Sequence, residues 1–203
     1  MTFTQTLSIP TFEQFITQLP DEEGRYEWVN GQIMRILPTR KHETLAELIT
    51  DIFKDEVKHS ELNYWVSGRI VIKTETNSGK EQGRYPDVTV VDKALWSANP
   101  TAYSALSNPP QLVVEVVSTN WEDDYVDKLE EYQRLGIPEY WIVDYLAVAS
   151  RSYLGNPKEP TIFICILTEN STYQINKYKG SDRLISPTFA QVVITVEQIL
   201  TQI

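Results

Sequence analysis

Residues 111–117 read QLVVEVV and form a nearly continuous apolar run. Strands that are buried on both faces have runs of this kind, so this segment is expected at the centre of a β-sheet. The run contains one charged residue, Glu115. Burying a lone ionised carboxylate costs several kcal/mol. We therefore expect Glu115 to be paired, protonated, placed at a strand end, or bound to a cation.

A helix and a second strand follow this run. Thr119 or Asn120 is expected to cap the helix, and Gly136 is expected to end it. Residues 139–144, EYWIVD, are predicted as the next strand. The strand–helix–strand order predicts an α/β or α+β fold around one mixed central sheet that is flanked by helices.

The N-terminal part is predicted to contain two helices and a hairpin. The expected elements are a helix over residues 12–19, strands over 25–29 and 32–37, and an amphipathic helix over about 41–57. Thr11 is a plausible N-cap of the first helix, and Pro20 is expected to stop it. Asn30-Gly31 lies between the two strand-like runs and is a strong hairpin signal.

The rest of the chain is predicted to be mainly β-structure. The expected elements are strands over 64–74 and 87–91, a loop over 100–110, a three-stranded meander over 148–178, and a final helix over 196–203. The length of 203 residues suits a single domain over residues 1–203. The fold class is thus α/β (α+β), with an N-terminal helix and hairpin and a C-terminal β-meander.

Composition limits the classes of partner. The chain has 28 acidic and 18 basic residues and a net charge of −10, which argues against strong non-specific binding to nucleic acid. A local basic groove can still coexist with an acidic remainder. No apolar run approaches the roughly 20 residues of a membrane span, and the N-terminus lacks the pattern of a secretory signal. We therefore expect no membrane partner. The single cysteine, Cys165, lies in an apolar run, which indicates a cytoplasmic protein.

A second carboxylate is placed like Glu115. Asp87 follows Pro86 and opens a strand-like run, 28 residues before Glu115. The two acids could lie side by side on neighbouring strands. Two carboxylates together with water molecules suit Mg²⁺. The alternatives are a turn aspartate and a solvent-facing or ion-paired glutamate.

A lysine follows on the next helix. Lys128 lies 13 residues after Glu115, on the border of the helix face that Tyr125, Val126, Leu129 and Tyr132 are expected to bury. It could form a surface pair with Asp124, four residues earlier. It could instead reach the metal site and stabilise transition-state charge or position a water molecule.

Three segments together resemble a known family. They are RYPDVTVV (84–91), LVVEVVS (112–118) and DYVDKLEEYQRLGIPEYWIVD (124–144). They resemble the family named "putative restriction endonuclease", of the PD-(D/E)xK nuclease superfamily, and the similarity covers most of the chain. The resemblance implies a restriction-endonuclease-like core, with Asp87 and Glu115 as ligands of Mg²⁺ or Mn²⁺.

The resemblance also bears on three other positions. In the superfamily's usual pattern a lysine follows two residues after the second acid, where this chain has Val117. The similar family has its lysine on the following helix, which matches Lys128. Glu27 matches an acid near the start of the family pattern, so it is either a further ligand through water or a hairpin-face glutamate. The backbone carbonyl of Val116 is implied as another ligand.

Several other polar residues have weaker patterns. His42 is similar to a family position and would touch substrate, unless it is a surface histidine at a helix start. The aromatic residues Tyr132, Tyr140 and Trp141 are expected in the core. Four basic residues precede Asp87 and form either a modest rim for phosphates or solvated surface: Arg69, Lys73, Lys80 and Arg84.

The resemblance implies a metal-dependent endonuclease that hydrolyses DNA phosphodiester bonds. Cutting both strands generally requires two sites, so a homodimer is expected, and a strand edge within residues 161–178 is a candidate interface. The alternative is a nuclease-fold binding or regulatory module without turnover. A two-carboxylate glycosidase ranks lower because no motif resembles an aromatic sugar cleft. The sequence also has no Gly-rich phosphate loop.

Overall fold

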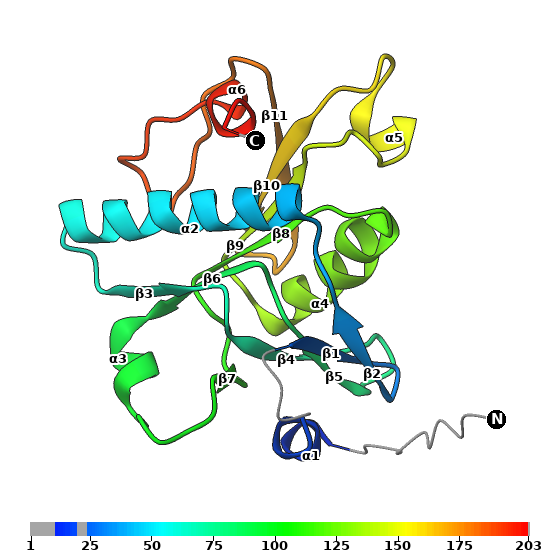
Figure 1. Ribbon diagram of the computed structural model, residues 1–203, viewed down its shortest axis with the longest axis vertical. Helices are drawn as coiled ribbons and strands as arrows, with labels where there is room; N and C mark the ends of the chain where they lie inside the picture. Colours follow the sequence, from blue (N-terminus) through cyan, green and yellow to red (C-terminus); the bar gives the residue numbers. More distant parts are fainter. Residues whose placement is uncertain (1–10, 20–23, 203) are drawn as a thin grey trace.

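The computed structural model describes residues 11–19 and 24–202. Their strands form two sheets (Figure 1). The strands of the central sheet are β3 (Tyr64–Ser67), β6 (Val88–Asp92), β8 (Leu112–Val116), β9 (Glu139–Asp144), β10 (Thr161–Leu167) and β11 (Tyr173–Lys179). Their order across the sheet is β11-β10-β9-β8-β6-β3. Because β8 and β9 are parallel and β6 and β8 antiparallel, this central sheet is mixed, as predicted.

The second sheet has five strands. They are β1 (Arg25–Val29), β2 (Gln32–Ile36), β4 (Val71–Glu75), β5 (Glu81–Arg84) and β7 (Ala105–Leu106), in the order β2-β1-β5-β4-β7. The prediction of one sheet is therefore wrong. The segment 64–74 divides between the sheets near Gly68, where a Cβ atom would lie 2.6 Å from the backbone oxygen of Asp87. Only glycine fits so close an approach.

The helices lie around these sheets (Figure 1). They are α1 (Phe12–Thr17), α2 (Arg40–His59), α3 (Lys93–Ser97), α4 (Lys128–Leu135), α5 (Arg151–Leu154) and α6 (Val196–Leu200). A π-helical turn, η1 (Asp123–Asp127), leads directly into α4. Helix α4 ends as predicted at Gly136, which has a φ of 87° in the left-handed region.

Strand β8 is covered on both faces, and this explains its apolar sequence. Val114 and Val116 pack in the same cluster as α2 and α6. Val113 and Val117 pack in the cluster that contains the buried residues of η1 and α4. Because side chains alternate along a strand, Glu115 points to the same side as Val113 and Val117. The charged residue of the apolar run therefore faces α4.

Most predicted elements of the N-terminal part are confirmed. Thr11 caps α1 through its side chain, while Pro20 lies outside the described residues. Asn30 and Gly31 have φ angles of 51° and 81°, as expected for a two-residue hairpin turn between β1 and β2. The long helix α2 and the final helix α6 also form where expected.

The prediction for the C-terminal meander is wrong in part. Residues 148–178 contain the short helix α5 and two strands, instead of three strands. The three-stranded meander is β9-β10-β11, because β9 pairs with β10 and β10 with β11. Within the segment 161–178, only β11 lies at an edge of its sheet. The candidate strand edge for a homodimer interface is therefore that of β11. No helix of residues 11–19 and 24–202 has the length and apolar character to cross a membrane.

Helix α4 is fixed to the second sheet through Glu131. This buried carboxylate accepts hydrogen bonds from the side chains of Thr74 (2.8 Å), Gln82 and Arg84 (2.7 Å to each oxygen). Arg84 is itself only 1% exposed. The contacts join β4 and β5 to the helix that carries Lys128.

We predict that Glu131→Ala strongly lowers the free energy of unfolding. Removing one partner of a buried ion pair leaves the other charge uncompensated, which typically costs about 3–5 kcal/mol. Urea denaturation followed by tryptophan fluorescence measures the change. The neighbouring exposed Glu130→Ala is the matched control and should stay within about 0.5 kcal/mol of the unsubstituted protein. Equal losses for the two variants would contradict the structural role of Glu131.

Candidate active site

Asp87 and Glu115 lie next to each other at the ends of two paired strands. Strands β6 and β8 are antiparallel, with Val88 opposite Val114. Continuing this register by one residue brings Asp87 opposite Glu115. The backbone N–H of Val116 donates a hydrogen bond of 2.8 Å to Oδ2 of Asp87. Both carboxylates line the same cavity of about 400 Å³.

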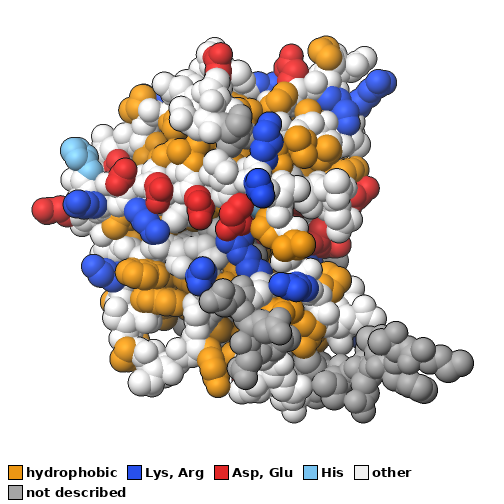
Figure 2. Space-filling model, in the orientation of Figure 1, with side chains coloured by type: hydrophobic (Ala, Val, Ile, Leu, Met, Phe, Trp, Pro, Cys, Tyr) orange, Lys and Arg blue, Asp and Glu red, His pale blue; other side chains and the backbone are white. Residues whose placement is uncertain are grey.

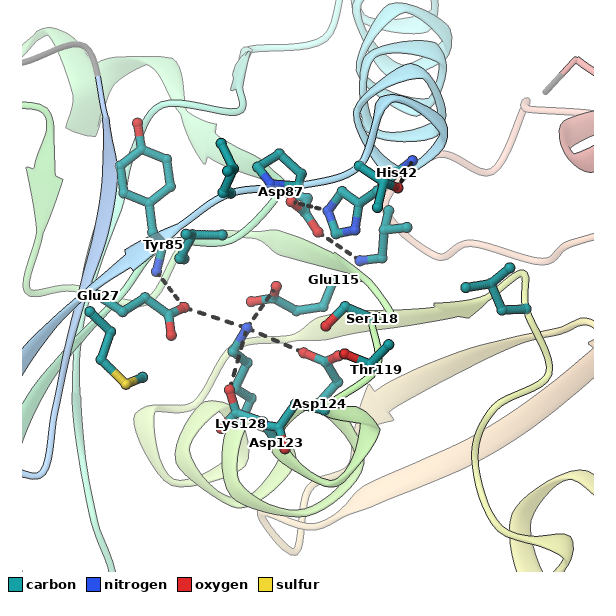
Figure 3. Close-up of a pocket in the computed structure, with 18 of the residues that line it drawn as sticks. Glu27, His42, Tyr85, Asp87, Glu115, Ser118, Thr119, Asp123, Asp124 and Lys128 are labelled. Carbon is teal, nitrogen blue, oxygen red and sulfur yellow. Dashed lines mark hydrogen bonds and ion pairs between the residues drawn. The ribbon is translucent and has the colours of Figure 1, made fainter.

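The Lys128 side chain lies at the centre of this cavity (Figure 3). Its ammonium nitrogen is 3.0 Å from Oε2 of Glu115, 3.2 Å from Oδ1 of Asp124 and 3.4 Å from Oε1 of Glu27. Asp123 is more distant, at 4.0 Å. The structure thus brings Asp87, Glu115, Lys128 and Glu27 together in one cavity.

The π-helical turn directs Lys128 into the cavity. The backbone N–H of Lys128 donates to the carbonyl of Asp123, five residues earlier. This wider turn changes which side chains face inward. Lys128 and Asp124 form an ion pair but are both buried, so the alternative of a surface pair is wrong. Val126, expected in the buried face, is 39% exposed. Turns of this type are often found at functional sites.

Glu27 is held by three different groups. Its Oε1 accepts a hydrogen bond of 3.1 Å from the backbone N–H of Tyr85, besides its contact with Lys128. Its Oε2 lies 3.3 Å from the guanidinium of Arg84. The side chain is 3% exposed and is therefore not a hairpin-face glutamate. Both of its oxygens are already engaged within the protein.

Arg84 does not belong to a basic rim. It is buried, pairs with Glu131 at 2.7 Å, and also contacts Glu27 and Asp123. Of the four basic residues that precede Asp87, none lines the cavity that contains Asp87 and Glu115. The prediction of a phosphate-binding rim at these positions is wrong for Arg84. The physical reason is that three carboxylates around one guanidinium hold it inside the protein.

Asp87 has partners on its other oxygen as well. Nε2 of His42 lies 2.8 Å from Oδ1 of Asp87, and the guanidinium of Arg25 lies 3.4 Å from it. His42 is 8% exposed, so the interpretation as a surface histidine is wrong. It opens α2, and the N-terminal end of this helix points at the cavity (Figure 3). His42 therefore fixes the orientation of Asp87.

Two residues have site roles that were not predicted from the sequence. The hydroxyl of Tyr132 donates a hydrogen bond of 2.6 Å to Oε1 of Glu115. Tyr132 is in the core as predicted, but it also anchors the central carboxylate. Its position four residues after Lys128 was the available signal, because residues with this spacing share one helix face. Asp124, four residues before Lys128, carries the same signal.

The site contains more buried carboxylates than buried cations. Five carboxylates are at least nine-tenths buried: those of Glu27, Asp87, Glu115, Asp124 and Glu131. The lysine and arginine side chains of the site that are buried to the same extent are Lys128 and Arg84. Burial raises the pKa of Glu115 well above its ordinary value, and the carboxylates of Asp87, Asp124 and Glu27 add to this effect, while Lys128 opposes it. Burial also raises the pKa of Asp124 to about 6. The excess of negative charge suits a cation.

The lysine itself stays charged. Burial alone would lower the pKa of Lys128, but Glu115, Glu27 and Asp124 outweigh this and raise the pKa well above its ordinary value. An ammonium with a raised pKa is a fixed positive charge at neutral pH. It is suited to stabilise developing negative charge and not to accept a proton.

The donor atoms of the site fit a hard divalent cation. Asp87 and Glu115 offer carboxylate oxygens, and the single thiol, Cys165, is buried with a pKa raised to about 12 by burial. In the described part of the chain, no group of three or more His, Cys, Asp or Glu residues is placed so that it could hold a metal ion. Mg²⁺ usually binds one or two carboxylates and keeps several water molecules, so two protein ligands suffice.

A solved structure has the same fold. It is the crystal structure of a protein from Anabaena variabilis that is described as a "putative nuclease belonging to DUF820". The TM-score is 0.68 at 14% sequence identity, and the match covers 93% of this chain and 96% of the other. This likeness confirms the mixed α/β fold. A search of curated proteins finds no significant match.

The chain belongs to the Uma2 family, which is described as "Putative restriction endonuclease". The family model matches residues 12–197. The matched region includes both sheets and every residue of the candidate site. The resemblance drawn from the segments around Asp87, Glu115 and Lys128 is thereby confirmed.

We predict that Asp124→Asn makes the stability of the protein less dependent on pH, so that the variant gains relative to the unsubstituted protein as pH rises from acid to neutral. The folded pKa of Asp124 is about 6 against an ordinary 3.8, so the folded state binds a proton more readily than the unfolded state. Stability contributed by Asp124 therefore falls as pH rises from about 4 to above 6. Relative to its effect at pH 4.0, the substitution should be more favourable at pH 7.5 by on the order of 1–3 kcal/mol, at about 1.4 kcal/mol per pKa unit.

Urea denaturation at pH 4.0 and 7.5 measures this difference. Asp55→Asn, at an exposed position of α2, is the control and should show no such pH-dependent gain. If Asp124→Asn lowers stability equally at both pH values, the account of Asp124 as an unfavourably buried carboxylate is wrong.

Proposed function

We propose that this protein is a divalent-metal-dependent endonuclease that hydrolyses DNA phosphodiester bonds. The observation that supports this most is the pairing of Asp87 and Glu115 on adjacent strands, with the Lys128 ammonium 3.0 Å from Glu115. Membership of a family described as "Putative restriction endonuclease" points to the same chemistry. In this proposal Asp87 and Glu115 are the metal ligands, with Mg²⁺ or Mn²⁺ as the cofactor.

The charged residues around Lys128 have defined parts in the proposed reaction. Bound Mg²⁺ or Mn²⁺ would supply Lewis-acid polarisation of the phosphate and lower the pKa of the attacking water. Lys128 supplies a permanent positive charge where the phosphate gains negative charge. Glu27 and Asp124 hold the ammonium group in position, at 3.4 and 3.2 Å. In this scheme Glu27 acts by holding Lys128 in place.

The orientation of the two ligands is also set by the chain. His42 and the Val116 N–H hold opposite oxygens of Asp87, both at 2.8 Å. Tyr132 holds one oxygen of Glu115 at 2.6 Å. Prearranged groups of this kind need little reorganisation during a reaction, and this is an important source of rate enhancement.

A nuclease-fold binding module without turnover is the second candidate. Two observations favour it: Lys128 is paired with Glu115, and Val117 stands where the superfamily's usual pattern has lysine. The nuclease would have DNA as its substrate, and both candidates are compatible with a homodimer through β11. They differ only in whether the phosphodiester bond is broken.

We predict that the protein cleaves DNA in the presence of Mn²⁺, with supercoiled plasmid and a single-stranded oligonucleotide as the two substrates. Asp87→Ala and Lys128→Met should each lower the rate by at least about 10²-fold, which is typical when one stabilising group is removed from an active site. The acidic residue Glu122 is exposed and does not line the cavity, so Glu122→Gln is the control and should cut at the normal rate.

The outcomes separate the two candidates. Binding of DNA with no cleavage of either substrate at any Mn²⁺ concentration would support the binding module and contradict the enzyme. Cleavage by Asp87→Ala at the rate of the unsubstituted protein would show that the active site lies elsewhere.

A further inference from the structure

The rim of the catalytic cavity carries exposed apolar side chains. Met34, Leu37 and Leu146 all line the cavity and are 43%, 84% and 49% exposed. They come from β2, from the connection between β2 and α2, and from the turn after β9. Large apolar side chains that are left in water at one opening commonly mark a binding surface.

The cavity has few free positive charges. Lys128 and His42 line it, but each is already paired with a carboxylate, which leaves Arg35 as the exposed cation among its described lining residues. Proteins that bind duplex DNA tightly typically contact about 6–10 phosphates with basic side chains. The lining of this cavity does not supply such a set.

The face of the molecule drawn in Figure 2 carries both acidic and basic side chains. Figure 2 shows acidic side chains in a row over α2, with Lys and Arg side chains beside them. The net charge of −10 has the same sign as the DNA backbone. Binding through phosphate neutralisation would therefore be weak on this face.

The reactive groups also lie deep in the cavity. Asp87, Glu115 and Lys128 are only 6%, 3% and 6% exposed. A phosphate must therefore enter the cavity to reach them. A strand with unpaired nucleotides bends more easily than a stacked duplex. It also exposes base faces, which can pack on apolar and aromatic side chains.

We propose that the substrate carries unpaired nucleotides at the phosphate to be cleaved, as in single-stranded DNA or a single-stranded flap. The bases next to this phosphate pack on Met34, Leu37 and Leu146, while the phosphate descends to Asp87, Glu115 and Lys128. The inference rests on the proposed function, since it assigns a substrate class to the same cavity. Apolar contact reads no base edge, so the preference is for strand state and not for sequence.

Three fluorescein-labelled DNAs of one sequence test the proposal. They are a single strand, a blunt duplex, and the duplex extended by a single-stranded flap. Binding is measured by anisotropy without metal, and cleavage is measured with Mn²⁺. We expect the single strand and the flap to bind at least about ten-fold more tightly than the duplex, and cleavage to occur in the unpaired segment. Raising the salt concentration should weaken this binding only slightly, because few phosphate contacts are involved.

Rim variants test the contact itself. The double variant Leu37→Ser with Leu146→Ser removes two exposed side chains, so the fold should be unaffected. It should weaken single-strand binding and raise KM by about five-fold, with kcat unchanged. This is the effect expected if the ligand covers, over the two side chains together, an apolar area equal to about half of one leucine side chain. Val193→Ser, at a position that is 69% exposed and lies outside the cavity lining, is the control and should bind normally.

Two results would overturn the proposal. One is equal binding of duplex and single strand, and the other is unchanged single-strand binding by the double variant. Because binding is measured without metal, this test is separate from that of the enzyme. Tight, rim-dependent binding of single strands without cleavage would support the substrate class and contradict the nuclease activity. Cleavage within the duplex at the single-strand rate would support the nuclease activity and contradict the proposed substrate class.

Discussion

The ammonium group of Lys128 lies within 3.4 Å of three buried carboxylates, those of Glu115, Asp124 and Glu27. These groups come from β8, from η1 and from β1 of the second sheet. Without the lysine, three negative charges would face one another inside the protein, at a cost of several kcal/mol each. The position of the helix relative to both sheets therefore depends on this contact. The same arrangement gives the cavity a fixed positive charge beside carboxylates that can accept a cation.

The rest of the fold serves to bring these groups together. The antiparallel register of β6 and β8 places Asp87 beside Glu115, and the π-helical turn rotates Lys128 toward them. The Arg84–Glu131 ion pair links the second sheet to α4 at 2.7 Å. Buried ion pairs of this kind contribute little net stability compared with apolar packing. Their presence is better explained by the geometry that they impose on the cavity.

The sequence predicted the pair of carboxylates, because both lie in apolar strand segments whose burial demands a partner. It placed Lys128 only on the border of the buried face of its helix, because a regular α-helical period does not predict a π-helical turn. The sequence left open whether His42 lies at the surface, because its partner Asp87 is distant in sequence and adjacent only after folding. Strand β5, with the sequence EQGR, has no apolar alternation, so neither the strand nor the buried Arg84 could be predicted from local pattern.

Calorimetric titration of Mn²⁺ into the protein tests the central claim that Asp87 and Glu115 form one metal site. The unsubstituted protein should bind the ion, and Asp87→Asn and Glu115→Gln should each abolish binding, because either change removes one of two carboxylate ligands. Glu122→Gln, exposed and outside the cavity, should bind normally. An absence of binding to the unsubstituted protein, or unchanged binding by both site variants, would contradict the account.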